Sequence, residues 1–342
     1  MKIAIVILNW NGKKLLEEFL PSVVKYSDNN PIYIIDNNSN DNSIDFIINK
    51  YPNINVILNR SNLGYAKGYN EGLKNVKEEV YCLLNNDIEV TKGWLYPITK
   101  EFESDKSVVV VQPKILDYKN KHKFEHAGAA GGFIDYFGYP YCRGRIFDSL
   151  EKDCGQYDQD IDIFWGSGAC FFIRKDIFEK LNGFDENFFT HMEEIDLCWR
   201  ITNFNSDLKK RFLYKSKVYH LGGGSLDYKN PKKLYFNVRN HFYTIVKNTD
   251  ISKLPYHFFG SLRLHIIRIF NLLLIFYYLF TFKFDFFKVL LKLFSSSEFN
   301  KNINKYLLLK KNNNYKNYYV IKSIIFNYLI LKKRKYSELN KS

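Results

Sequence analysis

The chain has 342 residues, of which 46% are hydrophobic, and it carries a formal net charge of +14 at pH 7. Residues 251–342 hold 17 Lys and Arg against 3 Asp and Glu, so the whole excess lies in that tail. A nucleic-acid-binding protein is disfavoured, because its basic side chains would be spread over a polar face and not confined to an apolar tail. The five cysteines form no Cys-x-x-Cys pair and are odd in number, which argues against a zinc site and a disulfide framework and indicates a reducing compartment.

The first ninety residues alternate between strand and helix patterns. The opening apolar run is too short for a signal peptide and reads as a buried strand. Pro21 is expected to kink the first helix. The predicted elements are strands at 3–8, 32–35, 54–58 and 80–84 and helices at 15–24 and 44–51. This order is typical of an open, mainly parallel α/β sheet, which binds ligands at the carboxyl ends of its strands.

Polar clusters follow the predicted strands at those ends: Asn9–Asn11, Asp36–Ser39, Asn59–Asn62 and Asn85–Asp87. No Gly-x-Gly-x-x-Gly follows the first strand, and the chain has no Gly-x-x-x-x-Gly-Lys, so a dinucleotide-binding Rossmann fold and a P-loop enzyme are disfavoured. Asp87 and Glu89 are two residues apart, so in an extended segment both point the same way and can share one divalent cation. The alternative is a solvated turn, since Asn-Asn-Asp is also turn chemistry.

Four segments together resemble family 2 glycosyltransferases, in particular the rhamnosyltransferase-like branch: Asn9-Trp10-Asn11, Asp36-Asn37-Asn38-Ser39, Asn62-Leu63-Gly64-Tyr65-Ala66-Lys67-Gly68-Tyr69-Asn70 with Gly72, and Leu84-Asn85-Asn86-Asp87. The likeness extends over roughly residues 3–245. It implies a GT-A fold, an α/β open mixed sheet with flanking helices, and a nucleotide-diphospho-sugar donor. It also implies that Asp87 holds a divalent metal, Mn²⁺ or Mg²⁺, on the donor diphosphate.

The predicted donor-binding residues are polar or glycine positions near these strand ends. They are Asn9, Asp36, Asn38, Asn62, Gly64, Lys67, Asn70, Asn85, Asn86 and Arg239. The Asp36 carboxylate suits a base edge or ribose hydroxyls, because it accepts from two donors at once. Gly64 and Gly68 bracket a run whose backbone N–H groups can approach the donor. Turn and cap roles, or a plain helix entry, are the alternatives for these residues.

A second acidic region follows a Gly-Phe-Asp-Glu sequence at 183–186. Asp196 and Arg200 lie at i, i+4 of a helix, so Asp196 is expected to be paired and structural. Glu193 and Glu194 are then the candidates for general base, because clustered carboxylates repel and one pKa rises toward the working range. We assign the base to Glu194, although the resembled family usually has Asp there. The alternative is an acidic first turn favoured by the helix dipole.

His220 begins a His-x-x-Gly-x-Ser sequence that resembles one in the family, where the His can join the metal shell. The alternative is a loop His that caps a strand. Arg239 can contact phosphate or pair with an acid. Between about 92 and 160 the pattern is less legible: a strand is predicted at 108–111 and a flexible glycine-rich loop at 125–132, and His126 is left out of the catalytic set.

The tail combines basic and aromatic residues. Residues 269–282 contain no charge, but fourteen residues are short of the roughly 20 needed to span a bilayer. Residues 284–294 fit an amphipathic helix in the plane of the membrane. Lys332, Lys333, Arg334 and Lys335 add a basic cluster suited to anionic lipid. The alternative is a helical hairpin packed on the catalytic domain.

The sequence therefore predicts a GT-A catalytic domain at 1–250, with a nucleotide-sugar half at 1–90 and an acceptor half at 91–250, followed by a membrane-associating helical tail at 251–342. The predicted activity is inverting, metal-dependent transfer of a sugar to a lipid-linked saccharide in cell-surface glycan synthesis. The predicted place is the cytoplasm, peripheral on the inner face of the cell membrane. A sugar-phosphate nucleotidyltransferase and a non-catalytic nucleotide-sugar-binding membrane scaffold are the alternatives.

Overall fold

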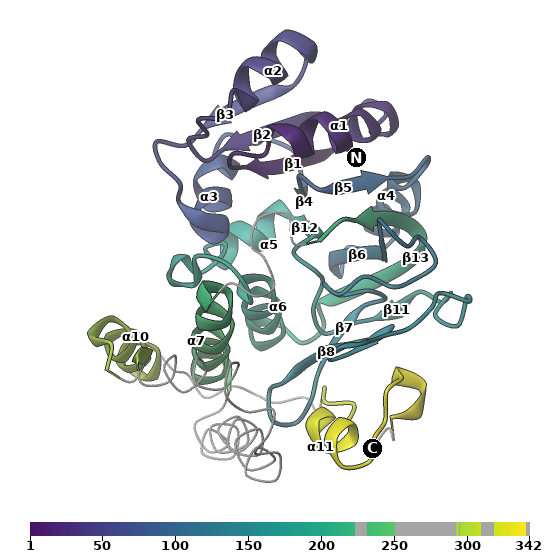
Figure 1. The fold of residues 1–342 in the computed structure, drawn as a ribbon, viewed down its shortest axis with the longest axis vertical. Helices are drawn as coiled ribbons and strands as arrows, with labels where there is room; N and C mark the ends of the chain where they lie inside the picture. The colour runs from purple at the N-terminus through teal and green to yellow at the C-terminus, as the bar shows by residue number, and fades with distance from the viewer. Residues whose placement is uncertain (223–230, 250–291, 294, 309–317, 340–342) are drawn as a thin grey trace, which may run out of the picture.

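The computed structural model describes residues 1–222, 231–249, 292–293, 295–308 and 318–339, and Figure 1 shows their arrangement. Within them, nine strands form the main sheet in the order β11-β13-β6-β12-β4-β1-β2-β3, and β5 pairs with β13. The strands are β1 (Ile3–Asn9), β2 (Ile32–Asp36), β3 (Asn55–Leu58), β4 (Val80–Asn85), β5 (Ile88–Val90), β6 (Val108–Asp117), β11 (Ile161–Asp162), β12 (Cys170–Arg174) and β13 (Lys209–His220).

The sheet is mixed in direction. Strands β3, β2, β1 and β4 are parallel, whereas β12 runs antiparallel to both β4 and β6. The register places Asn9 beside Asp36 and Leu8 beside Asn85, so the polar ends of three neighbouring strands lie at one edge. The predicted open α/β sheet is confirmed.

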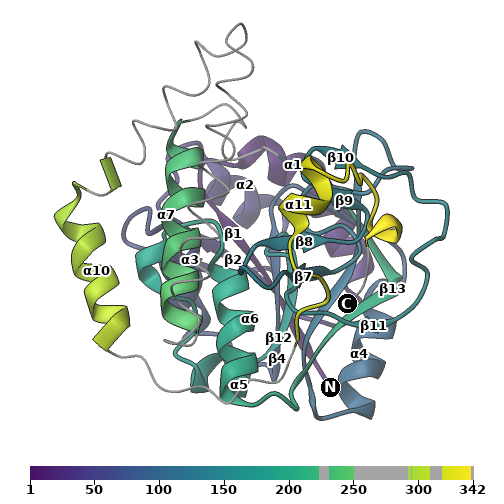
Figure 2. The same ribbon diagram turned by 90° about the horizontal axis from the view of Figure 1, so that it is seen from below.

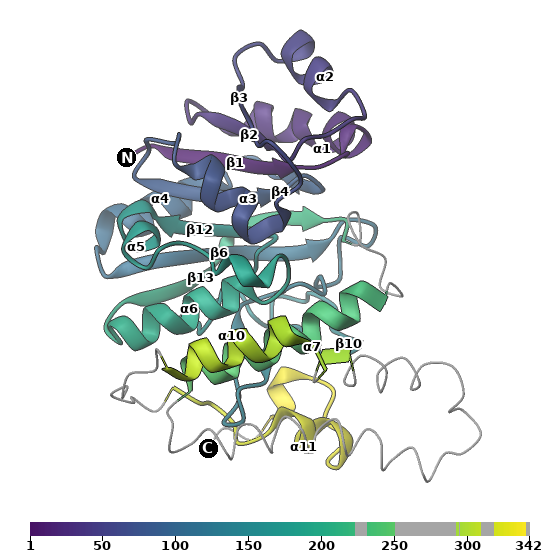
Figure 3. The same ribbon diagram turned by 90° about the vertical axis from the view of Figure 1, so that its left-hand side faces the viewer.

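Both faces of the sheet are covered by helices, which explains why the strands read as continuous apolar runs. In β1, Ile3, Ile5 and Ile7 pack into one core, and Ala4 and Val6 pack into the core on the opposite face. The first core is closed by α1 (Lys13–Tyr26), α2 (Ser43–Lys50) and α4 (Leu95–Ser104); the second is closed by α3 (Gly64–Leu73), α5 (Lys175–Lys180) and α6 (Glu193–Phe204). Figure 3 shows α3 and α6 on the side of the sheet that faces the viewer.

A second, smaller sheet lies in the region that the sequence left without clear elements. It contains β7 (Gly132–Ile134), β8 (Pro140–Cys142), β9 (Arg145–Ile146) and β10 (Ser149–Leu150). The prediction of a flexible loop at 125–132 is wrong, because Ala129 and Ala130 are fully buried and Gly128 accepts a hydrogen bond from the Gln112 amide (3.0 Å). Strands of two or three residues are too short to show an alternating pattern in a sequence.

Two helices extend the core beyond the sheet. The helix α7 (Pro231–Asn248) packs on α6, and α10 (Ser297–Leu308) packs on α7 (Figure 1). The rings of Tyr243 and Phe299 stack between them with centroids 5.4 Å apart. Part of the basic tail therefore contributes to the same folded unit as the main sheet and its helices.

The last described segment, 318–339, lies against the small sheet, and its helix α11 (Ile324–Leu329) is drawn beside β8 and β9 in Figure 2. The Ile324 N–H donates to Asp135 Oδ2 (2.9 Å), and the Trp199 indole on α6 donates to the Tyr318 hydroxyl (2.8 Å). The structure thus favours the alternative of packing on the domain for this part of the tail. The segment 269–282 and nearly all of 284–294 lie outside the described residues. Among the described helices, none has the length and apolar character to cross a membrane.

Candidate active site

The polar ends of β1, β2 and β4 form one hydrogen-bonded edge. The buried Asn9 amide donates to Asp36 Oδ1 (3.0 Å) and accepts from the Asn86 amide (3.1 Å). Asp36 also accepts from the backbone N–H (2.8 Å) and the hydroxyl (2.6 Å) of Ser39. A Cβ at Gly12 would lie 2.3 Å from Asn86 Nδ2, so only glycine lets the chain pass this edge. The structure brings Asn9, Asp36 and Asn86 together as the sequence predicted.

Asn37, which follows Asp36, connects this edge to the segments that carry Asn59 and Gly64. Its amide donates to the Gly64 carbonyl (2.9 Å) and accepts from the Asn59 amide (2.8 Å), and both Asn37 and Asn59 are buried. Asn38, which the sequence placed among the donor-binding residues, is exposed in a left-handed conformation with φ 63°. A turn role therefore describes Asn38 better than a buried donor contact does.

The N-terminus of α3 meets protein groups where we expected a donor. The Phe189 carbonyl accepts from the Tyr65 and Ala66 backbone N–H groups (2.7 and 3.2 Å), and Asn62 Oδ1 accepts from the Gly64 N–H (3.0 Å). Gly64 has φ +74°, and a Cβ there would lie 2.6 Å from the Phe189 ring. The glycine-bracketed run thus serves a close contact with the loop before α6, because its first N–H groups already have acceptors.

Two further predicted donor-binding residues on α3 face the same loop region. Lys67 forms an exposed ion pair with Glu186 (3.0 Å). The Asn70 side chain donates to the Phe184 carbonyl (2.8 Å) and accepts from the Phe184 N–H (3.0 Å). These contacts connect α3 to the Gly-Phe-Asp-Glu turn at 183–186. In this structure Lys67 and Asn70 therefore join two segments that are distant in the chain.

Asp87 lies directly after β4, in a turn that it forms with Asn86. The turn means that Asp87 and Glu89 do not belong to one extended segment, so the reason given for pairing them is wrong. Glu89 instead forms an ion pair with Lys121 (2.6 Å). The side chain that the structure brings against Asp87 is His220, at the end of β13, with Nε2 3.1 Å from Oδ1.

The position of His220 follows from the pairing of β13 with β5, which sets His220 opposite Ile88. The next N–H, of Leu221, donates to the Asp87 carbonyl (3.1 Å). The Asn85 amide lies 3.4 Å from His220 Nε2. A residue 133 positions later in the chain is thereby fixed beside the acid, as the resemblance implied.

The Asp87 and His220 side chains fit a divalent cation. Adjacent ligands on an octahedron with bonds of about 2.1 Å lie about 3.0 Å apart, close to the observed separation of Oδ1 and Nε2. Among the described residues, no group of three or more His, Cys, Asp and Glu side chains is arranged to hold a metal ion. Two protein ligands suit Mg²⁺ or Mn²⁺, which commonly complete their shell with substrate phosphate and water.

A second carboxylate, which the sequence analysis missed, lies on the other side of the imidazole. Glu125 Oε2 is 3.2 Å from His220 Nδ1, and both side chains are buried. Burial lowers the pKa of His220, but Asp87 and Glu125 outweigh that effect and raise the pKa to about 10. Burial raises the pKa of Glu125, but His220 reverses the effect, and the net shift is downward. A lone Glu before a glycine-rich run gave no sequence signal for this contact.

The neighbouring His126 has Arg145 as a partner. Its Nε2 is 3.2 Å from Arg145 Nη1, and burial, followed by the Arg145 charge, lowers its pKa to about 4. Its contacts agree with leaving it out of the catalytic set.

Glu193 and Glu194 begin α6, and the two carboxyl groups have different surroundings. Glu193 is 4% exposed, and burial followed by the Glu194 charge raises its pKa well above the ordinary range. Glu194 is half-buried, and burial raises its pKa to about 7 against backbone hydrogen bonds that lower it. Among the described residues, no group hydrogen-bonds to the Oε2 atom of either carboxyl.

Glu194 lies against a segment that adjoins the end of β4. A Cβ at Gly168 would lie 3.5 Å from the Glu194 carboxyl carbon and 3.2 Å from the Tyr65 hydroxyl, which donates to the Gly168 carbonyl (2.7 Å). The next residue, Ala169, accepts from the Asn85 N–H (2.9 Å). The candidate base and the candidate metal-binding acid, Asp87, therefore flank the same edge of the sheet.

The loop that leads into α6 is held in a strained conformation. Phe189, His191 and Met192 have φ of 62°, 71° and 73°, and such conformations cost on the order of 1–3 kcal/mol each for residues with side chains. The Asn240 amide on α7 donates to the Phe188, Thr190 and His191 carbonyls at 2.7–3.0 Å. A single side chain thus fixes the backbone immediately before the acidic pair.

Arg239 supports the same loop. Its Nη2 donates to the carbonyls of Asn187 and Phe188 (both 2.8 Å), and its Nε donates to Asn240 Oδ1 (2.9 Å). The side chain is buried. The sequence allowed two roles for Arg239, contact with phosphate or pairing with an acid, and these contacts show neither. Arg239 instead positions the loop before α6.

Asp196 is fully buried and paired, as predicted. It accepts from Arg200 Nε (2.7 Å), Lys247 Nζ (2.9 Å) and the Asn248 amide (2.8 Å). Lys247 also contacts Asp185 (2.7 Å) in the Gly-Phe-Asp-Glu turn. This network anchors α6 to α7 and does not include Glu193 or Glu194.

The comparison with protein families agrees with this geometry. The family model described as glycosyl transferase family 2 matches residues 4–181, more than half of the chain. The chain belongs to glycosyltransferase family 2. The resemblance drawn from its motifs is therefore confirmed, and the alternative of a sugar-phosphate nucleotidyltransferase has no support.

Two curated relatives act in glycan synthesis. The N-acetylglucosaminyl-diphospho-decaprenol L-rhamnosyltransferase of Mycobacterium tuberculosis is 24% identical over 231 residues, which cover 58% of this chain and 69% of that protein. The low-salt glycan biosynthesis hexosyltransferase Agl10 of Haloferax volcanii is 20% identical over 73% of this chain and 77% of its own length.

Among solved structures, GalNAc-T7 with UDP, GalNAc and Mn²⁺ has a TM-score of 0.56 at 17% identity and covers 72% of this chain. Staphylococcus aureus TarS has a TM-score of 0.51 at 14% identity and covers 77% of this chain. This chain spans about half the length of each of these two proteins. At these identities the likeness concerns the fold alone.

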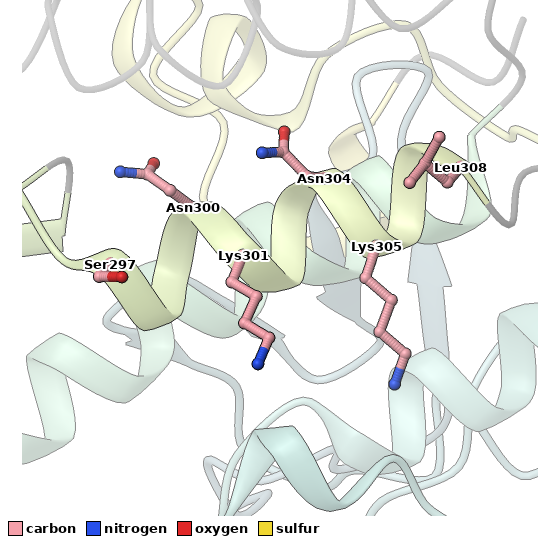
Figure 4. Close-up of a pocket in the computed structure, with 6 residues that line it drawn as sticks. All are labelled: Ser297, Asn300, Lys301, Asn304, Lys305 and Leu308. Atoms are coloured by element: carbon pink, nitrogen blue, oxygen red, sulfur yellow. The ribbon is translucent and has the colours of Figure 1, made fainter.

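A shallow depression elsewhere on the surface does not belong to the site. Figure 4 shows it along one side of α10, with lysine side chains pointing outward. It is lined by Ser297, Asn300, Lys301, Asn304, Lys305 and Leu308. None of these residues is among those that the site brings together.

Proposed function

We propose that this glycosyltransferase moves a sugar from a nucleotide-diphospho-sugar to a hydroxyl of a saccharide acceptor, with inversion at the anomeric carbon. The observation that carries the proposal is the placing of two chemical functions at one edge of the sheet. Asp87 and His220 form a pair suited to a divalent cation, and Glu194 lies beside Gly168, next to the end of β4. These are the two functions that an in-line displacement of a diphosphate requires.

Glu194 is the general base in this proposal. It takes the proton of the acceptor hydroxyl, the oxygen attacks the anomeric carbon, and the bond from that carbon to the diphosphate oxygen breaks. A pKa of about 7 allows the carboxylate to be free at neutral pH and still accept a proton. Glu193 is less suited, because it is almost completely buried, and burial followed by the Glu194 charge raises its pKa well above the ordinary range.

Asp87 and His220 would hold the divalent metal, Mn²⁺ or Mg²⁺. A cation bound there balances the negative charge that the diphosphate gains as it leaves. Asn9, Asp36 and Asn86 form the neighbouring edge, and we assign the nucleoside of the donor to it, since the Asp36 carboxylate keeps acceptor capacity for base or ribose donors.

The acceptor we propose is a lipid-linked saccharide at the inner face of the cell membrane. The decaprenol-linked substrate named for one relative and the basic tail of this chain support the proposal. The described part of the tail offers a surface for it: Phe326, Ile330 and Leu331 are 46–58% exposed beside exposed lysines. Apolar side chains ringed by lysines suit an anionic lipid surface.

Transfer measured in vitro tests this function and separates it from a non-catalytic nucleotide-sugar-binding scaffold. The purified full chain is incubated with Mn²⁺ and a panel of nucleotide-sugars, and binding is followed by thermal stabilisation. Donors that stabilise the protein are then tested for release of nucleoside diphosphate with and without lipid-linked acceptors. Binding that never leads to transfer or hydrolysis would favour the scaffold.

A further inference from the structure

We propose that Glu125 is a positioning residue that holds the His220 ring so that its Nε2 faces Asp87 and the cation. The inference rests on the proposed metal function of Asp87 and His220. It adds a residue from the small-sheet region to the site, although Glu125 does not touch the substrate or the metal.

The geometry supports this role from both sides of the ring. Glu125 Oε2 lies 3.2 Å from Nδ1 of His220, while Nε2 lies 3.1 Å from Asp87 Oδ1. Glu125 and His220 are 3% and 5% exposed, so water has little access to the contact. The imidazole thereby lies between two carboxylates, one from the turn after β4 (Asp87) and one from the segment between β6 and β7 (Glu125).

The carboxylate of Glu125 is itself fixed. Its Oε2 accepts from the Ala127 N–H, and its backbone N–H donates to the Ile115 carbonyl (3.2 Å). The preceding side chain, Phe124, is fully buried in the core. A carboxylate with this little freedom can set the orientation of the ring that it contacts.

The chemistry of imidazole explains why the contact matters. A histidine binds a metal through the lone pair of one ring nitrogen, so the other nitrogen must carry the proton. A carboxylate at Nδ1 favours the proton there, so the proton on Nε2 is the one released when a cation binds. Outer carboxylates of this kind raise metal affinity, and their loss commonly weakens binding about 10–100-fold.

A simpler explanation is that Glu125 and His220 form a buried ion pair that only stabilises the fold. The two explanations differ in what happens to metal affinity when His220 is absent. If Glu125 acts through the ring, its removal has no further effect on a protein without the ring.

The experiment measures Mn²⁺ binding to the full-length protein from the loss of the free Mn²⁺ signal in electron paramagnetic resonance. For Glu125→Ala we expect Mn²⁺ affinity to fall about 10–100-fold. Glu125→Gln keeps an oxygen acceptor for the Nδ1 proton and should lose less. Glu151→Gln is the matched control, because Glu151 is also buried but contacts Tyr157 and the Tyr336 N–H. It should bind Mn²⁺ as the parent does.

The decisive comparison is a double-mutant cycle. Glu125→Ala should weaken Mn²⁺ binding in the parent and leave it unchanged in a His220→Ala background. An equal loss in both backgrounds would show that the Glu125 charge attracts the cation directly, and wild-type affinity in Glu125→Ala would also overturn the inference. If Glu125→Ala has a markedly lower Tm than the parent, the same double-mutant cycle is measured with Glu125→Gln.

The failure of the proposed metal site gives a different result. In that case Asp87→Ala and the parent protein bind Mn²⁺ equally. If Asp87→Ala abolishes binding while both Glu125 variants retain it, the metal site stands and only the role of Glu125 is wrong.

Discussion

Glu193 and Glu194 are adjacent in the chain and have the same side chain, but the first turn of α6 directs them into different surroundings. Glu193 is enclosed in the core, and Glu194 lies against Gly168 at the edge of the sheet. Glu194 takes the place of an Asp that is usual in the resembled family. The choice between the two bases therefore depends on burial and not on chemistry.

Changing Glu194 to Gln tests that choice. The amide keeps the shape but cannot accept a proton, so turnover should fall by about 10²–10⁴ while donor affinity is retained. Glu193→Gln is the matched control and should retain most of its turnover, since Glu193 is enclosed in the core, where it cannot reach a substrate hydroxyl. Steady-state kinetics with donor binding by calorimetry measure both. Inactive Glu193→Gln beside active Glu194→Gln would reverse the assignment.

The pH dependence gives a second test of the same carboxyl. Glu194 has a pKa raised to about 7 by burial, and only its deprotonated form acts as a base. We expect kcat to rise with pH up to about 7 and to level off above it. A pH–rate profile in the range 5–9 measures this. A plateau that extends down to pH 5 would show that the base has an ordinary carboxyl pKa.

Asp87 is the residue whose loss should separate binding from folding. Asp87→Ala removes the carboxylate from the turn after β4, so Mn²⁺-dependent affinity for nucleoside diphosphate and transfer should both be lost. The backbone contact from Leu221 to the Asp87 carbonyl remains, so the circular dichroism spectrum should not change. Unchanged Mn²⁺-dependent affinity in calorimetry would rule out Asp87 as a metal ligand.

At the scale of elements, α7 fixes the loop that leads into α6, the helix on which the candidate base Glu194 lies. Arg239 and Asn240 together contact carbonyls from Asn187 to His191, a stretch with left-handed residues. Strain in that stretch persists because the hydrogen bonds from α7 compensate for it. The position of Glu194 thus depends on a helix that comes about 45 residues later in the chain.

Replacing Asn240 by Ala should release this loop. Three carbonyls lose a donor, and leaving buried groups unsatisfied costs about 1–3 kcal/mol in the free energy of unfolding. Turnover should fall with it, because Glu194 is no longer held. Asn237→Ala is the control on the same helix. Its amide donates to the Lys233 carbonyl (2.9 Å) within the helix and not to the loop, so its effect should stay below about 0.5 kcal/mol. Urea unfolding measures the stability of the two variants, and kcat measures their turnover. Equal effects of Asn240→Ala and Asn237→Ala would contradict the role of α7 in fixing the loop.

For the whole molecule, the described tail segments are part of the folded unit. The segment 318–339 covers Phe133, Phe164 and Trp199 with aromatic contacts from Tyr318 and Tyr336. Truncation near residue 250 would remove this segment and expose the core that it covers. Point substitutions on the outer side of the tail are therefore the better probe of membrane contact.

Exposed apolar residues on α11 and just after it can be substituted for this purpose. We expect the combined change Phe326→Ser, Ile330→Ser and Leu331→Ser to weaken sedimentation with phosphatidylglycerol vesicles about 10–100-fold. Full burial of one apolar side chain contributes about 1.5–3 kcal/mol, and these partly exposed side chains would each contribute only a fraction of that. Nucleotide-sugar binding should not change. The contributions of Lys322, Lys332 and Lys335 should fall with salt, because screening weakens charge attraction.

The matched control changes three exposed residues far along the chain from α11: Ile48→Ser, Leu58→Ser and Tyr96→Ser. This variant should sediment like the parent. If the α11 variant also does so, any membrane contact lies elsewhere in the chain, and if neither protein sediments at low salt, the membrane proposal is wrong.

The sequence by itself determined most of the helices and strands in residues 1–90. Apolar runs buried on both faces predicted β1, β2 and β4 within a residue or two, and the polar residues at their ends followed from the direction of the strands. The same was true of the Asp196–Arg200 pair, which depends only on helical spacing. Periodicity is a local property, so one sequence is enough to read it.

Only the tertiary structure decided which side chains meet across the chain. The contact of Asp87 with His220 and not with Glu89 depends on a turn and on the pairing of β5 with β13, and the contact of Glu125 with His220 depends on a segment without periodicity. The difference between Glu193 and Glu194 arises in the same way from packing. Burial and pKa are set by the sum of many distant neighbours, and no spacing along the chain encodes that sum.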